Sequence, residues 1–264
     1  MALFKSFAKK KDLYNECNSC RIHEAIRTSV TLEKGNLTKE HDKNLSLGNL
    51  KECAHFMILL KACGKKKDLY NGTCLHDKIL KSGLLKNSPY LGSGLIGMYA
   101  RCGMLDKAQK VLDELPIRNV VVWSTLISGY VQQGEYHDAL NCFEQMQIEG
   151  LSPNVITFTC ILKACGNTGC VDKGNNIHTE ISDRGLLKKD IVLGTALVEM
   201  YAKCGVLEKA ERVLEEISIR DVVAWNALLV GYAHHGQNNK TINSFGRMQN
   251  EGTCPDVITF ICIL

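Results

Sequence analysis

The chain has only four prolines, an aromatic content of 6% and a small formal net charge of +4 in 264 residues. No uninterrupted apolar run approaches the ~20 residues that a membrane-spanning helix needs, which argues against a membrane protein. The mild positive charge permits a polyanionic partner but does not require one. The sequence shows no phosphate-binding glycine loop, catalytic triad or paired acid and base, so we expect neither an enzyme nor a cofactor.

Two further absences concern the start of the chain and its cysteines. Residues 1–7 contain too short an apolar run for a secretory signal peptide, and lysines follow this run instead of preceding it. The 13 cysteines match no secretory disulfide pattern. We therefore expect free thiols in a reducing compartment.

A repeat of 102 residues dominates the sequence from about Phe56 to the end. Trp123 returns as Trp225, and the segment 155–158 returns as 257–260, with no gap needed anywhere in this register. A fixed period of this kind indicates a repeat architecture before any other fold is considered.

Each 102-residue unit divides into related pieces of 35, 36 and 31 residues, and each piece reads as two short helices. In the 35-residue piece, apolar residues at i, i+3, i+4 and i+7 predict one buried stripe on each helix. The two stripes are Trp123, Leu126, Ile127 and Tyr130, followed by Ala139, Cys142, Phe143 and Met146. Gly134 breaks the pattern between them, and Gly150 stands where a left-handed C-cap is expected.

All four prolines fall at joints between the pieces, where a missing backbone N–H does least harm. They are Pro89, Pro116, Pro153 and Pro255. One helix pair has too little core to fold alone, so neighbouring pairs must stack to bury their stripes. The sequence therefore predicts an all-α fold of stacked helix-turn-helix repeats, an α-solenoid.

The regular array begins at Cys53. Its pieces are 53–88 (long), 89–119 (short), 120–154 (standard), 155–190 (long), 191–221 (short), 222–256 (standard) and 257–264, the start of a further long piece. An array that stops within a first helix exposes apolar surface without a capping repeat. We therefore expect the chain to be a fragment of a longer protein.

The residues before the array follow a different register. Residues 1–35 read as a degraded long piece, because the segment 9–15 recurs as 65–71, and a polar linker is expected at 36–52. An organelle transit peptide is the alternative for residues 1–35. Their acidic residues and near absence of arginine argue against it.

The alternation of 35, 36 and 31 residues resembles the pentatricopeptide repeat (PPR) family, specifically its plant-type subclass of standard, long and short repeats (PLS). The phrases that carry the resemblance are Trp123–Tyr130, Met98–Gly103, Met200–Gly205 and Leu162–Gly166. It covers residues 53–264 strongly and residues 1–35 weakly. The resemblance implies a right-handed α-solenoid and sequence-specific binding of single-stranded RNA in mitochondria or plastids, with one base read per repeat.

By this resemblance, the fifth and last residues of each repeat read the base. These pairs are Ser93/Asn119, Ser124/Asn154, Thr159/Asp190, Thr195/Asp221 and Asn226/Asp256. Asp only accepts hydrogen bonds and suits the imino N–H of G or U, whereas Asn can donate to the ring nitrogen of A or C. In the family, Ser or Thr at the fifth position goes with purines and Asn with pyrimidines, so the expected RNA is 5′-AAGGU-3′. The first long repeat has Met57 and Ser88 at its reading positions, and we assign no base to this pair.

Apolar residues at the second position of the repeats would sandwich the bases, again by resemblance. They are Val121, Val192 and Val223. However, Ser, Thr, Asn and Asp near helix starts are also what N-capping alone would select. The lysine clusters 9–11, 65–67 and 188–189 could contact phosphates, or could be solvated turns.

Two patterns suggest metal chemistry only weakly. Cys17, Cys20 and His23 have metal-like spacing, but no second ligand pair stands nearby. His178 and Glu180 match the first half of a zinc deaminase signature whose second half is absent. We therefore expect no metal, and we expect His178 to be a packing or surface residue.

Three functions remain open. The first is an RNA-binding module without catalysis of its own, which protects a transcript or presents it to a processing factor such as a C-to-U editing deaminase. The second is a protein-binding helical scaffold. The third is an enzyme, either deaminase or nuclease, which would need metal ligands or an acidic cluster beyond Leu264.

Overall fold

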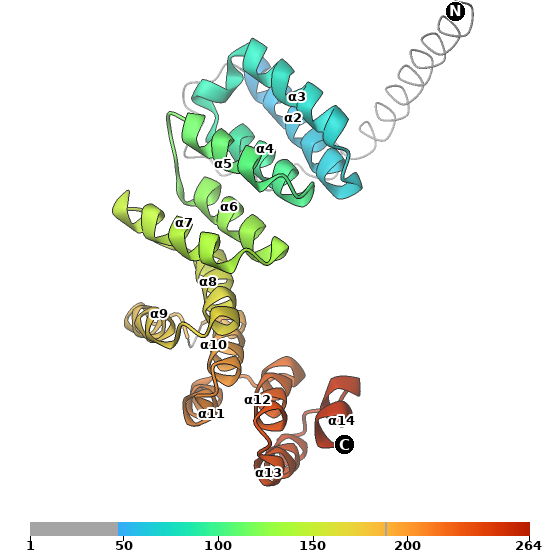
Figure 1. Cartoon of the computed structure of the whole chain (residues 1–264), viewed down its shortest axis with the longest axis vertical. Coiled ribbons are helices and arrows are strands. Elements are labelled where there is room, and N and C mark those ends of the chain that lie inside the picture. The colour runs from blue at the N-terminus through green and yellow to red at the C-terminus, as the bar shows by residue number, and fades with distance from the viewer. Residues whose placement is uncertain (1–46, 188) are drawn as a thin grey trace, which may run out of the picture. The chain divides into compact units, whose positions relative to one another are not determined.

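Figure 1 shows the computed structural model of the chain, in which residues 47–187 and 189–264 are described. The regular structure in these residues consists of thirteen α-helices and one 3₁₀ helix, without strands. The elements are α2 (Leu47–Lys66), α3 (Leu69–Ser82), η1 (Leu84–Asn87), α4 (Pro89–Arg101), α5 (Leu105–Glu114), α6 (Val120–Gln133), α7 (Tyr136–Ile148), α8 (Val155–Thr168), α9 (Val171–Asp183), α10 (Ile191–Lys203), α11 (Leu207–Glu216), α12 (Val222–His234), α13 (Asn238–Asn250) and α14 (Val257–Ile263).

The chain divides into two compact units, residues 1–58 and residues 59–264. Within the first unit, α2 begins at Leu47, so the polar linker expected at 36–52 does not reach residue 52. The reason is that Leu50 already lies three residues before the buried Cys53, on the same face of one helix. The degraded repeat expected at 1–35 lies outside the described residues.

In the second unit, helices follow one another in antiparallel pairs, and the first helices of successive pairs pack side by side (Figure 1). The packed series of first helices is α4, α6, α8, α10, α12 and α14. The second helices α5, α7, α9, α11 and α13 each contact both the first helix of their own pair and that of the next pair. This stacking confirms the predicted α-solenoid for residues 59–264.

Side chains at the helix starts and glycines at the turns define these pairs. Each first helix from α4 to α14 follows a Ser, Asn or Asp whose side chain accepts hydrogen bonds from free backbone N–H groups. Gly134 ends α6 with a φ of 85°, and Gly150 follows α7 with a φ of 74°. Both adopt the left-handed conformation, which the sequence predicted for Gly150, and Gly134 lies at the predicted break between the two helices. Pro89 is the first residue of α4.

The predicted apolar stripes form the core, except that Tyr130 is only half-buried. Trp123, Leu126 and Ile127 of α6 are buried, as are all four predicted stripe residues of α7. The first helices approach closely because small residues face each other between them. A Cβ atom built on Gly129 would lie 2.6 Å from the Cβ of Ala100. No larger side chain fits between α4 and α6 at this point.

Exposed ion pairs link successive second helices. Lys173 of α9 pairs with Glu144 of α7. Arg247 of α13 reaches Glu211 at 2.7 Å and Glu215 at 3.0 Å, both on α11. These side chains are all partly exposed, so each pair is worth at most about 1 kcal/mol. The second helices are therefore held together more weakly than the first helices.

Candidate functional site

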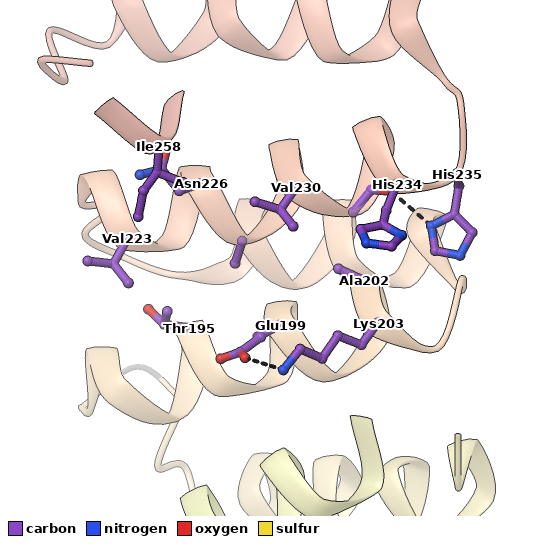
Figure 2. A pocket seen from close by; sticks show the side chains of 12 residues that line it. Thr195, Glu199, Ala202, Lys203, Val223, Asn226, Val230, His234, His235 and Ile258 are labelled. Atoms are coloured by element: carbon purple, nitrogen blue, oxygen red, sulfur yellow. Dashed lines mark hydrogen bonds and ion pairs between the residues drawn. The ribbon is translucent and has the colours of Figure 1, made fainter. Parts of the chain in front are cut away.

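Two cavities open between consecutive first helices. The larger, about 400 Å³, lies between α10 and α12 and is closed on one side by Ile258 of α14. Figure 2 shows Thr195 and Glu199 of α10 below Val223 and Val230 of α12. The smaller, about 250 Å³, lies between α4 and α6 and includes Ile156 of α8.

The two cavities are lined by corresponding residues, 102 positions apart in the sequence. The matched residues are Gly97 and Glu199, Ala100 and Ala202, Arg101 and Lys203, Val121 and Val223, Ser124 and Asn226, Gly129 and Gly231, and Ile156 and Ile258. The close contact of Gly129 with Ala100 recurs as Gly231 with Ala202, again at 2.6 Å. The repeat therefore builds the same cavity twice.

Exposed apolar side chains occupy the second position of the repeats, and four of them line the cavities: Val121 and Ile156 the smaller, Val223 and Ile258 the larger. The predicted Val121, Val192 and Val223 are 48%, 54% and 58% exposed. Sequence reasoning missed three more residues at this position, and their exposure is similar. These are Tyr90 at 47%, Ile156 at 59% and Ile258 at 51%. Selecting the apolar residue at the second position of every repeat, including the long and short ones, would have identified them.

The predicted last-position residues are the N-caps of the first helices. Asn119 Oδ1 accepts from Val122 N at 3.0 Å, and Asn154 Oδ1 accepts from Thr157 N at 2.9 Å. Asp190, Asp221 and Asp256 cap α10, α12 and α14 in the same way. Capping, the alternative raised from the sequence, is thus a real role of these side chains. All five remain partly exposed.

Most predicted fifth-position residues turn toward their own helix. The hydroxyls of Ser93, Ser124 and Thr159 donate to backbone carbonyls three or four residues earlier, at 2.8, 2.6 and 2.8 Å. Thr195 lines the larger cavity (Figure 2). In the described part of the chain, these four side chains make no hydrogen bond to the last residue of their own repeat.

The fifth predicted pair is joined directly. Asn226 Nδ2 donates to Asp256 Oδ1 at 2.9 Å. The hydroxyl of Thr259, a fully buried residue, lies 2.7 Å from Asn226 Oδ1. Asn226 is itself buried within α12, and it lines the larger cavity. The sequence predicted Asn226 and Asp256 but missed Thr259, whose part depends on how α14 packs against α12.

Charge is distributed unevenly along the cavities. Hydrogen bonds from the backbone N–H of Thr259 and from the amide of Asn226 lower the pKa of Asp256, so this carboxylate remains an acceptor at neutral pH. Lys203 forms an ion pair with Glu199 at 2.8 Å (Figure 2). In the smaller cavity, Arg101 takes the place of Lys203 and a glycine that of Glu199.

Two histidines and the cysteines outside the two cavities are held by packing and hydrogen bonds. His76 and His178 lie on second helices, and their Nδ1 atoms are 2.9 and 3.0 Å from the hydroxyls of Tyr99 and Tyr201. Burial lowers the pKa of both histidines. His178, expected to be a packing or surface residue, is half-buried and packs edge-on against Tyr201. No cysteine from Cys63 to Cys262 in the described segments forms a disulfide, and burial raises the pKa of Cys165 to about 12.

The remaining sequence candidates add no site. No group of three or more His, Cys, Asp or Glu residues that could hold a metal occurs within 47–187 and 189–264. Cys17, Cys20, His23, the lysines 9–11 and Lys188 lie outside the described residues. Lys65, Lys66 and Lys67 are exposed at the end of α2. None of the described helices is both long and apolar enough to cross a membrane.

Three relatives from Arabidopsis thaliana illustrate the similarity to known proteins. The chloroplastic pentatricopeptide repeat-containing protein At4g18520 is 37% identical over 270 residues, which covers 96% of this chain and 43% of the relative. The chloroplastic protein At4g25270 is 36% identical over 218 residues, covering 82% and 41%. The chloroplastic/mitochondrial protein At1g59720 is also 36% identical over 218 residues, covering 79% and 33%. The chain thus spans less than half of each relative.

Solved structures share the fold. The pentatricopeptide repeat protein PPR10 from maize matches with a TM-score of 0.63 and 19% identity, covering 79% of this chain and 30% of that chain. The complex of PPR10 with an 18-nt psaJ RNA element matches with a TM-score of 0.62, 19% identity and coverages of 79% and 31%.

Family models identify the repeats themselves. The model of the PPR repeat family matches residues 118–167 and 220–264. The model of the PPR repeat matches residues 93–120, 156–186 and 195–222. Together these matches span more than half of the sequence. The matched segments coincide with helix pairs of the structure. The chain belongs to the pentatricopeptide repeat family.

Proposed function

We propose that this chain binds single-stranded RNA sequence-specifically, one base per repeat, as a recognition module without chemistry of its own. The observation that carries the proposal is the row of exposed apolar second-position residues, of which Val121, Ile156, Val223 and Ile258 line the two cavities. Membership of the PPR family and the fold shared with PPR10, which has been solved in complex with an RNA element, support it.

Capping accounts for the polar residues at the helix starts but not for this apolar row. Val223 and Ile258 are large, branched and more than half exposed on the walls of one cavity, and Asn226 lies within the same cavity. Exposed apolar groups of this size are unfavourable in water. A nucleobase has two apolar faces and a polar edge, so it would cover both side chains and present its edge to Asn226.

The proposed reading pairs give the target 5′-AAGGU-3′. The pairs Ser93/Asn119 and Ser124/Asn154 read A, Thr159/Asp190 and Thr195/Asp221 read G, and Asn226/Asp256 reads U. The assignment assumes that the repeats follow the PLS order of standard, long and short repeats, with the boundaries given in the sequence analysis. Positive charge near the bases would come from Arg101, which lines the smaller cavity, whereas Lys203 in the larger cavity is paired with Glu199.

The proposed setting is RNA processing, C-to-U editing or stabilisation in a mitochondrion or plastid. Its support is that the relatives At4g25270 and At1g59720 are named as chloroplastic and as chloroplastic/mitochondrial proteins. A processing factor, such as an editing deaminase, would act on the RNA that the repeats hold. The activity of the whole protein is part of this proposal, because the chain spans only part of its relatives.

Fluorescence anisotropy with labelled AAGGU tests RNA reading directly. A scrambled RNA of equal composition and a salt titration accompany it. We expect tighter binding to AAGGU, and we expect the preference at the fifth base to move away from U when Asn226→Asp and Asp256→Asn are combined. Equal, strongly salt-dependent binding to both RNAs would refute base reading. Absence of RNA binding would favour a protein-binding scaffold.

A matched pair of surface variants tests the apolar row. Val223→Ser is expected to weaken binding to AAGGU, because it removes one wall of the base site. Ile148→Ser is the control: Ile148 is 76% exposed at the end of α7 and lines neither cavity. Equal affinities of the two variants would show that the row does not contact RNA.

A further inference from the structure

We propose that Thr157 and Thr259 are specificity-determining positioning residues. Their buried hydroxyls orient the side-chain amides of the base-reading residues Asn154 and Asn226, so that each amide offers an N–H donor to its base. This orientation favours A over G at Asn154 and U over C at Asn226. The inference deepens the proposed RNA binding and rests on it.

Each threonine is the third residue of a long repeat and has no exposed surface. Thr157 Oγ1 donates to Asn154 Oδ1 at 2.9 Å, and the backbone N–H of Thr157 donates to the same oxygen at 2.9 Å. Asn154 Oδ1 therefore receives two inward hydrogen bonds. Its amide nitrogen is left as the group available to a ligand.

The second threonine acts across two helices. Thr259 Oγ1 on α14 lies 2.7 Å from Asn226 Oδ1 on α12 and 3.1 Å from Asp256 Oδ1. A hydroxyl carries one proton. Asp256 Oδ1 already accepts from Thr259 N and from Asn226 Nδ2, each at 2.9 Å. The proton therefore goes to the shorter contact, Asn226 Oδ1.

These contacts assign the Asn226 amide. Its oxygen faces the Thr259 hydroxyl, and its nitrogen faces the Asp256 carboxylate. A flipped amide would place Asn226 Oδ1 against Asp256 Oδ1, two acceptors in contact. The orientation is therefore enforced from both sides, and one N–H of Asn226 remains for the base.

The fixed orientation matches particular base edges. An outward N–H on Asn154 suits N1 of adenine, an acceptor, and opposes N1–H of guanine, a donor. Beside Asp256, the remaining N–H of Asn226 forms a donor next to an acceptor. Uracil offers the complement when its O2 faces the Asn226 N–H and its N3–H faces the Asp256 carboxylate; cytosine in the same place turns an acceptor, N3, toward that carboxylate.

Packing alone does not require a hydroxyl at this position. The third residues of the repeats 89–119, 120–154, 191–221 and 222–256 are buried and apolar. They are Leu91, Val122, Leu193 and Ala224. A buried hydroxyl is costly unless it is hydrogen-bonded. At Thr157 and Thr259, the bonds that satisfy it lead to proposed base-reading residues.

The test uses Thr157→Val and Thr259→Val, which keep the buried shape and lose the hydroxyl. Dissociation constants are measured by anisotropy for AAGGU, AGGGU and AAGGC. Thr157→Val is expected to reduce the preference for A over G at the second base, and Thr259→Val that for U over C at the fifth. Loss of one hydrogen bond corresponds to a reduction of about 2–12-fold. The effect of Thr259→Val is the larger, because no backbone N–H of the described residues donates to Asn226 Oδ1.

Each variant serves as the control for the other, since each should change only its own base. Thr241→Val is the structural control, because Thr241 is buried in α13 and donates to Gln237 O at 3.2 Å. It should leave both preferences unchanged. Thr259→Ser keeps the hydroxyl and should retain a U preference within about twofold of the original chain.

The outcomes separate this inference from the proposed function. If the unaltered chain does not distinguish AAGGU from a scrambled RNA, RNA reading itself fails. If it does, but the valine variants keep their base preferences, the positioning role is refuted. A general loss of preference in all three valine variants would also refute it.

A second measurement needs no RNA. The side-chain amide protons of Asn226 in the free chain are expected to be protected from exchange with solvent, as NMR would show. Thr259→Val should reduce this protection, and Thr259→Ser should restore it. Unchanged amide signals in Thr259→Val would overturn the inference even if a variant bound RNA too weakly to measure.

Discussion

The contact between Gly129 of α6 and Ala100 of α4 allows a sharp test of how the first helices stack. A Cβ at position 129 would lie 2.6 Å from Ala100 Cβ, a distance that real Cβ atoms essentially never show. Ala100 Cβ is fixed to the backbone and cannot rotate away. Gly129→Ala should therefore push α4 and α6 apart.

The magnitude follows from two opposing effects. Replacing Gly by Ala within a helix normally gains about 1 kcal/mol. Overpacking a core costs about 1–3 kcal/mol. Gly246→Ala in α13 is the matched control, since no atom lies within 4 Å of a Cβ built there. We expect Gly246→Ala to stabilise the chain and Gly129→Ala to fall about 1–3 kcal/mol below it.

Urea-induced unfolding followed by circular dichroism measures the difference. Because repeat arrays can unfold in parts, amide hydrogen exchange in α6 serves as a local readout. Adding Ala100→Gly to Gly129→Ala should relieve the clash, with a coupling energy of about 0.5–3 kcal/mol in a double-mutant cycle. If Gly129→Ala stabilised the chain as much as Gly246→Ala, the described approach of α4 to α6 would be wrong.

Three further predictions concern single side chains. Trp123→Phe should lower the free energy of unfolding in urea by about 1 kcal/mol more than Trp225→Phe does. The reason is that Trp123 Nε1 donates to the Glu149 carboxylate at 2.7 Å, whereas Trp225 Nε1 is buried without a partner in the described region. Equal unfolding midpoints of the two variants would contradict this. Iodoacetamide at about pH 8 should modify the exposed Cys254 and spare the folded, buried Cys165, as mass spectrometry would show, because only the thiolate reacts. The preference for U over C should stay constant between about pH 8 and pH 5, because hydrogen bonds hold the pKa of Asp256 below the ordinary value near 4. The preference should weaken only as the pH falls through that lowered pKa, and anisotropy showing a loss near pH 6 would refute the assignment.

Local signals in the sequence were sufficient to predict the helix pairs. Stripes such as Trp123, Leu126 and Ile127, and turn glycines such as Gly134, act within one repeat, so periodicity alone locates them. The start of α2 at Leu47 was missed because polar residues between the apolar ones were read as a linker.

The candidate site was only partly accessible from the sequence. The positions of Asn226 and Asp256 follow from the repeat register. The bond between them and the bond from Thr259 depend on how α14 packs against α12, and no spacing within one repeat encodes that contact. Similarly, the spacing of Ser124 and Asn154 in the sequence does not show that the Ser124 hydroxyl donates to a backbone carbonyl of its own helix.

The two rows of helices differ in mechanical character. Along the first helices, contacts such as Gly129 with Ala100 join atoms at or near the backbone, so these helices cannot move apart without losing close packing. Along the second helices, pairs such as Arg247 with Glu211 use long side chains that can extend. Tension on residues 59–264 would therefore be accommodated mainly by spreading of the second helices. Because salt screens those exposed charges, ionic strength should tune the elasticity of one edge of the array while the other stays stiff.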